Sequence, residues 1–383
     1  MRFNLRRRKA TIHSAPIPSL KSLILGVFAK TSKADSWLSK SPLEYSVQSY
    51  SRGAWALDGG ISQLLKHRNK NNGLVFVPDY LCDEALTPLR MKNRKLYFYP
   101  VRQDLSPDWD KLEIICDNNE LPDVFVLVHY FGFTNCLSKA EEFCKIYGIE
   151  LIEDCAHLLI PTNNYGQNTA IFSPWKHLPL ANTGLLRISN SKLTSSPIVQ
   201  YSWSKIPILK WLTLRMLQRI MLMVGFSWHR FRKKRVNSET IQGSTDPYPT
   251  RYSLKLLTVY EQELDKVIRI RRSNYESLWH SCVNRDGVQP LFELLPDDIS
   301  PYAFPLIVSR ESGNIISAFN ENGVPAYSWP NLPQEVIENS KEHKTANWLQ
   351  RHLMLLPVHQ DLSARQIEYV ISVIDNIFEK VKE

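Results

Sequence analysis

The chain has few cysteines for its length. Six occur among 383 residues, and none belongs to a CxxC or CxxH pair. A disulfide framework or a structural zinc site would need closely spaced ligands, so neither is indicated and no bound metal is expected. Cysteines that sit mostly within apolar runs fit a reducing compartment, and we expect a cytoplasmic protein.

The sequence also lacks an internal repeat, a low-complexity segment and a long uncharged hydrophobic run. Its 43% apolar residues are enough for one large core and a smaller second domain. Residues 23–29 follow a basic stretch and so mimic a signal peptide, but Lys21, Pro16 and Pro18 lie against this short apolar run. We expect residues 1–40 to form an N-terminal arm with an amphipathic helix packed on the body of the protein.

The net charge of +9 is concentrated in two clusters, at residues 6–9 and 230–235. A uniformly basic surface is absent, so no nucleic-acid partner is expected. The second cluster ends an apolar segment, residues 206–235, that contains too many cations to span a membrane and predicts one or two helices with an apolar face. Two interpretations stay open: this face packs on protein, in this chain or a dimer partner, or it makes peripheral contact with an anionic leaflet.

Strand and helix signals alternate through the middle of the chain. Short β-branched or aromatic runs occur at residues 73–77, 96–99, 124–128, 149–152 and 185–188, and helical apolar spacing occurs at 54–66 and 138–147. A capping box formed by Ser138 and Glu141 predicts the start of the second helix. The alternation predicts an α/β fold, with a mainly parallel sheet flanked by helices.

The pattern changes after about residue 272. A strand is expected at 302–308, and a closing helix at 367–381, preceded by a capping box of Ser363 and Gln366. These features predict three parts: the arm at 1–40, a large domain at 41–272 that includes the basic segment, and a small α+β domain at 273–383.

Ligands of open α/β sheets bind beyond the carboxyl ends of the strands, so motifs near those ends are candidate sites. In the first motif, Gly53 and Ala54 open a predicted helix directly after Arg52. Free backbone N–H groups at a helix start, with an arginine beside them, suit a phosphate group. The alternative is that the glycine only makes a turn.

The second motif is a buried strand that ends in Asp154, with His157 just beyond it. A buried carboxylate is costly unless a cation meets it. A protonated pyridine nitrogen is such a cation, and an aspartate that holds this proton lets the ring act as an electron sink. The alternative is an aspartate that caps a helix beginning at Cys155.

The third motif is Lys176, the one lysine in the apolar and aromatic run of residues 170–177. Apolar surroundings help a lysine to lose its charge, and a neutral amine can attack an aldehyde to form a Schiff base. The alternative is a lysine whose stem packs on apolar surface while its ammonium group reaches solvent.

In order and spacing, these motifs resemble the DegT/DnrJ/StrS family of sugar aminotransferases, which depend on pyridoxal 5'-phosphate (PLP) and have the aspartate aminotransferase fold. The resemblance extends from about Ser51 to the C-terminal helix. Its most specific part is a Glu-Asp-x-Ala segment followed by the lysine, with Asp154 and Lys176 22 positions apart. It also runs through Pro78-Asp-Tyr-Leu-Cys82, Val128-His-Tyr-Phe-Gly132, Phe172-Ser-Pro-Trp-Lys176, Thr250-Arg-Tyr-Ser253 and Leu356-Pro-Val-His359.

The resemblance implies a role for each matched residue. Lys176 would hold PLP as a Schiff base, and Asp154 would pair with the pyridine nitrogen. The phosphate would lie at the helix start formed by Gly53 and Ala54, next to Arg52 and Ser173. The resemblance also implies a homodimer with shared active sites, in which Arg251 reaches the site of the neighbouring subunit.

The sequence departs from the family pattern in four ways. His157 stands where most relatives have a glutamine that contacts the phenolic oxygen of PLP, and imidazole can make the same hydrogen bond. Cys82 falls near the usual stacking aromatic, so either Tyr80 substitutes for it or the stack is absent. Pro249 replaces an asparagine that supports the phosphate. Finally, the stretch between the aspartate and the lysine is short, and the basic segment is long.

By this resemblance the protein would transfer an amino group, with glutamate as the expected donor, to a keto sugar carried on a nucleotide, in surface polysaccharide, lipopolysaccharide or amino-sugar biosynthesis. Lys176, once released, would move protons between the substrate and the cofactor. A PLP-dependent sugar dehydratase is one alternative, although such relatives have histidine in place of this lysine. The other is a non-catalytic or divergent PLP-fold protein that binds a polysaccharide intermediate or an assembly partner at the membrane.

Overall fold

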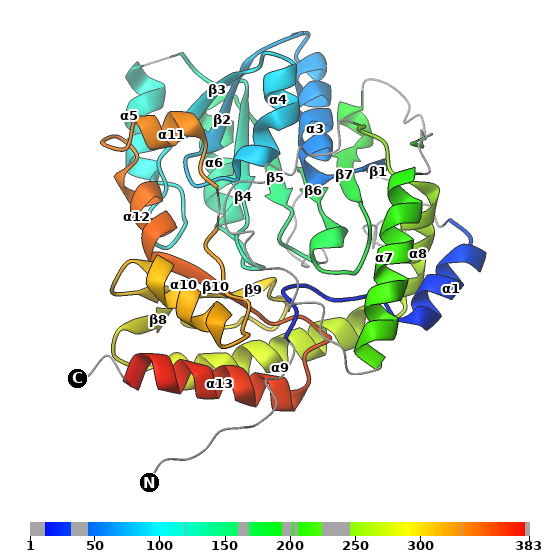
Figure 1. Ribbon diagram of the computed structural model, residues 1–383. Coiled ribbons are helices and arrows are strands. Elements are labelled where there is room, and N and C mark those ends of the chain that lie inside the picture. The colour runs from blue at the N-terminus through cyan, green and yellow to red at the C-terminus, as the bar shows by residue number, and fades with distance from the viewer. Residues whose placement is uncertain are drawn as a thin grey trace.

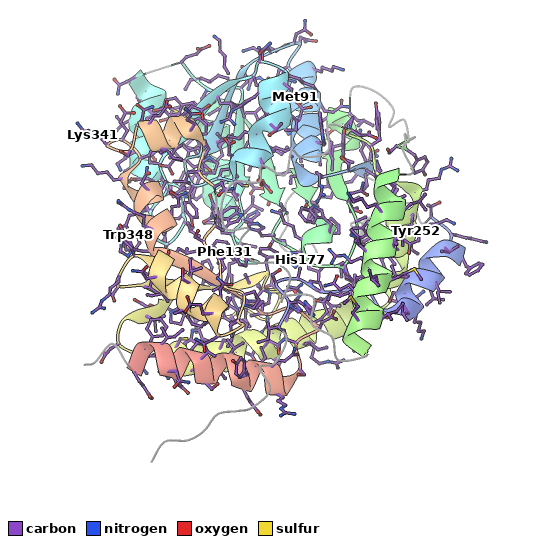
Figure 2. All side chains as sticks on the ribbon, in the orientation of Figure 1. Met91, Phe131, His177, Tyr252, Lys341 and Trp348 are labelled. Atoms are coloured by element: carbon purple, nitrogen blue, oxygen red, sulfur yellow. The ribbon has the colours of Figure 1, made fainter. Side chains whose placement is uncertain are left out.

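The structure is a computed structural model that describes residues 12–31, 45–118, 120–159, 168–193, 201–202, 206–223, 246–329 and 331–379. A seven-stranded sheet with flanking helices lies above a layer that contains a three-stranded sheet (Figure 1). Side chains fill the space between these layers, and Phe131 and His177 lie at their junction (Figure 2). The predicted α/β fold class is confirmed.

The large sheet has the strand order β1-β7-β6-β5-β4-β2-β3. Its strands pair in parallel from β3 to β6, whereas β7 runs antiparallel to both β6 and β1. The bounds are β1 (Tyr45–Tyr50), β2 (Leu74–Pro78), β3 (Lys95–Tyr99), β4 (Val124–Val128), β5 (Glu150–Cys155), β6 (Thr169–Phe172) and β7 (Gly184–Ser189). The five predicted strands are all present, and β1 and β6 are additional. Strand β4 is a continuous apolar run because helices cover both faces of a parallel sheet.

Helices of the large domain pack on this sheet. They are α3 (Gly53–His67), α4 (Thr87–Met91), α5 (Trp109–Asn118) and α6 (Leu137–Tyr147), with short 3-10 turns η1 (Asp83–Leu86), η2 (Pro174–Lys176) and η3 (Asn190–Lys192). The two predicted helices correspond to α3 and α6. The capping box predicted at Ser138 is wrong, because α6 begins one residue earlier with Cys136 as its N-cap. Ser138 therefore lies within the first turn, and its hydroxyl contacts the Cys136 thiol at 3.5 Å.

The smaller sheet has the antiparallel order β10-β9-β8. Its strands are β8 (Val288–Pro290), β9 (Ala303–Val308) and β10 (Leu353–Pro357), packed with α9 (Leu264–Cys282), α10 (Ser312–Glu321), α11 (Gln334–Glu338), α12 (Lys344–His352) and α13 (Ala364–Glu379). The capping box before α13 is confirmed: the Ser363 N–H donates to Gln366 Oε1 at 2.9 Å, and the Gln366 N–H donates to Ser363 Oγ at 3.4 Å. The domain boundary proposed at residue 272 falls inside α9, a helix that contacts both layers.

Three further helices lie together beside β1 and β7 (Figure 1). They are α1 (Leu20–Phe28), α7 (Ile206–Met223) and α8 (Arg251–Glu261). The predicted packing of the N-terminal helix on the protein body is confirmed, since the Tyr252 hydroxyl of α8 donates to the Leu23 carbonyl of α1 at 2.8 Å. The predicted helix in the basic segment is present over 206–223, and the cluster at 230–235 lies outside the described residues. Within the described ranges, no helix combines the length and apolar character needed to cross a membrane.

Candidate active site

Loops from four neighbouring parallel strands meet at the carboxyl edge of the large sheet. They follow β2, β4, β5 and β6, and each carries part of a motif that the sequence singled out. The start of α3 lies against the same edge, because a Cβ atom on Gly53 would come within 3.2 Å of Ser173 Oγ. The fold therefore gathers motifs that are more than 120 residues apart in the chain.

Lys176 ends the short turn η2 that follows β6. Its N–H donates to the Ser173 carbonyl at 2.9 Å, which holds the turn closed. Burial lowers the pKa of the Lys176 ammonium, while the nearby Asp154 carboxylate opposes this shift. A lysine with a lowered pKa is more readily neutral, which is the state that attacks an aldehyde.

Asp154 lies near the end of β5 with its side chain buried. One carboxylate oxygen accepts the Ala156 N–H at 2.9 Å. Burial raises the pKa of this carboxyl, and Lys176 lowers it in part. The helix-cap interpretation is wrong, because a turn and not a helix follows Cys155. The site therefore holds a buried carboxylate that would gain from a cationic partner, such as a protonated pyridine nitrogen.

His157 lies between two aromatic rings, nearly parallel to both. Its ring centroid is 5.6 Å from that of Phe131 and 4.7 Å from that of Tyr302. The Phe131 N–H donates to His157 Nδ1 at 3.3 Å, which places the ring proton on Nε2. Burial lowers the pKa of His157 well below its ordinary value, with Lys176 adding to the effect. The imidazole is thus a neutral donor.

The Nε2 atom of His157 is buried, and no described residue accepts its hydrogen bond. A buried polar group without a partner is costly, so a native protein that keeps one usually satisfies it with a ligand or water. An acceptor such as the phenolic oxygen of PLP fits this donor. The structure therefore supports the idea that imidazole can replace the glutamine of the family pattern.

The start of α3 forms a narrow backbone cradle. Arg52 is its N-cap, and no described side chain caps the helix, so its first N–H groups remain available. A Cβ atom on Gly184 would lie 2.2 Å from the Arg52 carbonyl oxygen, which shows how closely β7 approaches this start. The Arg52 guanidinium stacks 4.0 Å above the Trp175 ring, directly before Lys176. Arg52, Gly53, Ala54 and Ser173 thus lie together, in an arrangement that suits a phosphate.

Tyr80 is not brought together with these residues. Its ring packs against Trp329, at 5.6 Å between centroids, and its hydroxyl donates to the Trp329 carbonyl. Cys82 instead faces the lysine: burial raises the pKa of its thiol to about 12, and the charge of Lys176 opposes this shift. Tyr80 therefore serves the core, because its polar end already has a buried partner, and it does not substitute for the missing stacking ring.

Arg251 also lies apart from the lysine in this single chain. It is exposed at the start of α8, with its guanidinium 4.6 Å above the Tyr201 ring. The preceding segment does approach the cradle, since the Ser51 N–H donates to the Pro247 carbonyl at 2.8 Å. This geometry leaves Arg251 accessible to a second subunit, and its assignment to a neighbouring active site stays a prediction.

Sequence reasoning missed Arg271, which connects the lysine loop to the small domain. Its side chain is 1% exposed and donates to the His177 carbonyl at 2.8 Å, the Pro301 carbonyl at 3.1 Å and Gln360 Oε1 at 2.9 Å. The signal was present, because Arg271 interrupts an otherwise apolar stripe of α9 at helical spacing. A buried cation bonded to three separate segments holds them at fixed positions.

Two further residues near the lysine had no signal in the sequence. The Glu84 carboxylate raises the pKa of Arg52 and of Lys176, opposing the effect of burial in both cases. His177 is fully buried, and neither of its ring nitrogens has a hydrogen-bond partner among the described residues. Both residues come from loops whose positions depend on tertiary contacts, so local patterns could not assign them to the site.

A buried group behind the site has the residue types of a metal site. The candidate ligand atoms of His129, Glu153 and Cys155 lie within 4.8 Å of one another. However, His129 Nε2 is 3.0 Å from a Glu153 oxygen, and its Nδ1 accepts the Asn135 N–H at 3.0 Å. Since both ring nitrogens are used within the protein, this group is better explained as a buried polar contact between β4 and β5.

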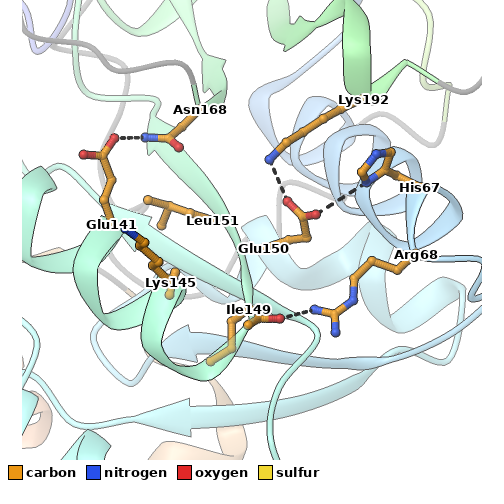
Figure 3. Close-up of a pocket in the computed structure, with 11 residues that line it drawn as sticks. His67, Arg68, Glu141, Lys145, Ile149, Glu150, Leu151, Asn168 and Lys192 are labelled. Atoms are coloured by element: carbon orange, nitrogen blue, oxygen red, sulfur yellow. Dashed lines mark hydrogen bonds and ion pairs between the residues drawn. The ribbon is translucent and has the colours of Figure 1, made fainter.

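An open pocket of about 800 Å³ lies at the opposite edge of the sheet (Figure 3). It is lined by charged groups from α3, α6, β5 and η3, and the central carboxylate among them is already paired. Lys192 contacts Glu150 at 2.7 Å, and His67 contacts the other oxygen of the same carboxylate at 3.5 Å. Glu150 is therefore held by partners within the chain.

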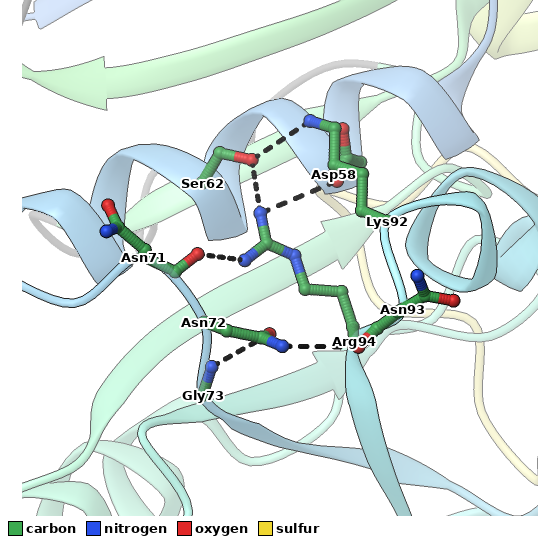
Figure 4. A network of polar contacts seen from close by, with 8 residues as sticks. All are labelled: Asp58, Ser62, Asn71, Asn72, Gly73, Lys92, Asn93 and Arg94. Atoms are coloured by element: carbon green, nitrogen blue, oxygen red, sulfur yellow. Dashed lines mark hydrogen bonds and ion pairs between the residues drawn. The ribbon is translucent and has the colours of Figure 1, made fainter.

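A second charge network fastens α3 to the connection between α4 and β3 (Figure 4). Asp58 is buried on α3, and one of its oxygens lies 2.5 Å from Lys92 Nζ. The Arg94 guanidinium donates to Ser62 Oγ at 2.8 Å and to the Asn71 carbonyl at 3.0 Å. This network joins three segments of the chain, and we interpret it as a structural contact.

Comparison with known proteins gives different results for the sequence and for the fold. No family model and no curated protein matches the sequence. In contrast, solved structures match almost the whole chain. PseC from Helicobacter pylori, an aminotransferase involved in the biosynthesis of pseudoaminic acid, has 13% identity and a TM-score of 0.67 over 97% of this chain and 99% of its own.

Two other structures give the same result. A DegT DnrJ EryC1 StrS aminotransferase from Brucella abortus has 15% identity and a TM-score of 0.61 over 87% of this chain and 86% of its own. Spr1654 from Streptococcus pneumoniae, in its PMP form, has 15% identity and a TM-score of 0.68 over 97% of this chain and 100% of its own. At these identities the similarity establishes the architecture. The chain therefore has the fold of the DegT/DnrJ/EryC1/StrS-type sugar aminotransferases, as the sequence resemblance predicted.

Proposed function

We propose that the protein is a PLP-dependent aminotransferase that acts on a sugar. The observation that carries this proposal is a buried Asp154 carboxylate and a half-buried Lys176 that act on each other's pKa, beside the unpartnered Nε2–H of His157. These groups lie at the carboxyl edge of the sheet, where open α/β folds bind their ligands. The fold shared with sugar aminotransferases supports the same conclusion.

Each residue of the site has a distinct task in this proposal. PLP, when bound, supplies an electron-withdrawing ring that eases removal of a proton from the substrate carbon. Asp154 would keep the proton on the ring nitrogen, and His157 would donate to the phenolic oxygen. Lys176 would attach the cofactor and, once released, move a proton to and from the substrate carbon.

The phosphate would bind at the start of α3. The free N–H groups of Gly53 and Ala54 would donate to it, and the Ser173 hydroxyl and the Arg52 guanidinium lie beside them. A helix start and an arginine both favour a dianion, and the stacking of Arg52 on Trp175 keeps the cation in place. No other loop of the described site supplies a comparable set of donors.

We further propose a keto sugar carried on a nucleotide as the amino acceptor, and glutamate as the donor. The proposal of a sugar rests on the structural similarity to sugar aminotransferases and on the basic character of the chain, which suits a diphosphate-linked substrate. A homodimer would supply Arg251 to the site of the neighbouring subunit. A non-catalytic role is the second candidate, because Cys82 leaves the cofactor without the usual stacked ring.

The test starts with the purified protein reconstituted with PLP. We expect a yellow absorption band that glutamate bleaches, and borohydride should fix the cofactor to the peptide that contains Lys176. Lys192→Ala is the matched control, because that lysine pairs with Glu150 at the opposite edge of the sheet. A protein that stays colourless after reconstitution would rule out the enzymatic function, and fixation to another lysine would rule out Lys176.

Shared active sites can be tested by mixing two inactive variants. Lys176→Ala and Arg251→Ala subunits are unfolded together and refolded, so that mixed dimers form. If Arg251 acts across the interface, one site of each mixed dimer has both residues intact, and activity returns. A mixture that stays as inactive as its parents, although mixed dimers form, would place Arg251 outside the neighbouring site.

A further inference from the structure

Helix α7 exposes a group of apolar side chains although it packs on the protein. A helix packed on its own domain normally buries its apolar stripe and exposes its polar one. The inward stripe of α7 begins with buried Ile208 and half-buried Trp211 and Leu212, and continues with half-buried Arg215, Gln218 and Arg219. The apolar side chains on the other side have exposed fractions between 43% and 58%: Leu209, Leu214, Met216, Leu217 and Ile220.

Helix α1 also exposes apolar side chains. Ser22, Leu23 and Gly26 are buried, and a Cβ atom on Gly26 would lie 3.2 Å from the Leu256 side chain of α8. The larger apolar residues face outward, with Phe28 80% exposed and Ile24 57% exposed, together with Leu25 and Val27. The small residues therefore let α1 approach α8 closely, while most of the apolar area of α1 remains uncovered.

Hydrogen bonds fix this orientation. The Arg219 guanidinium of α7 donates to the carbonyls of Ile17 and Pro18, at 3.0 and 3.2 Å, just before α1 begins. On the other side of α1, Lys255 of α8 donates to the Val27 carbonyl at 3.0 Å. These bonds hold α1 between α7 and α8, where Tyr252 also contacts it (Figure 2). We call the outward apolar residues of the two helices the α1/α7 face.

The charges on the α1/α7 face all have one sign. Neither helix contains an aspartate or a glutamate, whereas Lys21 and Lys210 are exposed on them. Helices whose charges are all cationic and whose apolar side chains are exposed are typical of a membrane interface, where aliphatic side chains enter the acyl boundary and lysines meet lipid phosphates.

We propose that the α1/α7 face docks on an anionic lipid leaflet. A second copy of the chain is a poorer occupant, because its own α1 and α7 contain no carboxylate that could pair with these cations. A leaflet with negative headgroups would instead attract the same cations. This proposal does not depend on amino transfer, since the face lies on α1 and α7 and contains none of the residues of the lysine site.

Flotation of the full-length protein with vesicles tests the proposal. We expect it to float with phosphatidylcholine vesicles that contain phosphatidylglycerol, far less with phosphatidylcholine alone, and less again at high salt. The triple variant Leu214→Gln, Leu217→Gln and Ile220→Gln should lower partitioning by more than about tenfold, because each side chain loses its burial in the bilayer. Ile146→Gln is the matched control, since Ile146 is an apolar side chain 69% exposed on α6.

A second variant separates the apolar from the electrostatic part. Lys210→Glu leaves the apolar residues intact and should weaken binding to the anionic vesicles alone. The proposal is overturned if the triple variant floats like the wild type, or if lipid charge makes no difference. It is equally overturned if sedimentation shows that the triple variant turns a dimer into monomers, since the face would then be an interface between copies of the chain.

Discussion

Two buried aspartates, Asp58 and Asp154, both lie near a lysine, but their other contacts differ. Asp58 is within 2.5 Å of Lys92 and near Arg94, in a network that connects three segments (Figure 4). Asp154 accepts one backbone N–H, and beside it stands a histidine donor without a partner in the described part of the chain. Two cations of the chain lie beside Asp58, so its charge is balanced within the protein and the contact is structural, although Asp58 Oδ1 accepts no hydrogen bond from the described residues. Beside Asp154, the Nε2–H of His157 is a buried donor that a ligand can complete.

The pocket at the opposite edge of the sheet supports this distinction. Its volume of about 800 Å³ would suit a small molecule, but Glu150 is already held by both Lys192 and His67. Size alone therefore does not identify the site. The unpartnered donor of His157, beside the buried Asp154 at the carboxyl edge of the sheet, identifies it better, because a ligand there would remove an existing cost.

The largest expected effect comes from removing Lys176. Lys176→Ala should lower aminotransferase activity by at least about a hundredfold, because the residue both attaches the cofactor and transfers a proton. The melting temperature should stay close to that of the wild type. Activity with a keto sugar nucleotide and glutamate, together with thermal unfolding, measures both quantities, and a fully active variant would contradict the assignment.

Next in size is the effect of Asp154→Asn on cofactor affinity. The amide cannot balance a pyridinium charge, so the dissociation constant of PLP should rise by about tenfold or more, or about 1.4 kcal/mol. Without PLP, the variant should be at least as stable as the wild type at neutral pH. Burial raises the pKa of Asp154, so its contribution to stability is lost as the pH rises through that value. Absorbance titration and melting of the unloaded protein measure the two effects.

Lys92→Ala should have the opposite effects on stability and on PLP affinity. It leaves Asp58 buried with a weaker cationic partner, so the free energy of unfolding should fall by about 2 kcal/mol while PLP binding is unchanged. The loss should shrink in acid, because burial raises the pKa of Asp58 and protonation removes the uncompensated charge. Denaturant unfolding at two pH values checks this, and a loss of PLP affinity equal to that of Asp154→Asn would remove the contrast between the two aspartates.

The last prediction concerns the pH dependence of stability that His157 contributes. Its pKa is lowered in the folded protein, so its contribution to stability is present above the ordinary histidine pKa and is lost as the pH falls. Below about pH 6.5 this loss should approach about 1.4 kcal/mol per pH unit for each such imidazole. His157→Gln removes this imidazole, so the free energy of unfolding should fall less steeply as the pH decreases. An unchanged slope would mean that His157 is already protonated in the folded state.

Much of the architecture was predictable because it depends on local patterns. The β-branched runs located β2, β3, β4, β5 and β7, and helical spacing located α3 and α6. The order of Gly53, Asp154 and Lys176 along the chain was enough to predict the fold that the solved structures share. In contrast, β6 was missed because it has only four residues, and β1 because serine and glutamine make up half of its six residues. The capping box at Ser138 failed because a pattern match does not show where a helix begins.

The sequence by itself determined that Asp154 lies at the end of a buried strand, because the apolar run before it is local, and the order of the motifs linked this aspartate to Lys176. Only the tertiary structure decided that Tyr80 belongs to the core, that Arg271 connects the lysine loop to the small domain, and that His157 keeps an unpaired donor. It also decided that α1 and α7 expose several of their apolar side chains. Each of these depends on contacts between segments distant in sequence, and such contacts select among orientations that the local sequence permits equally.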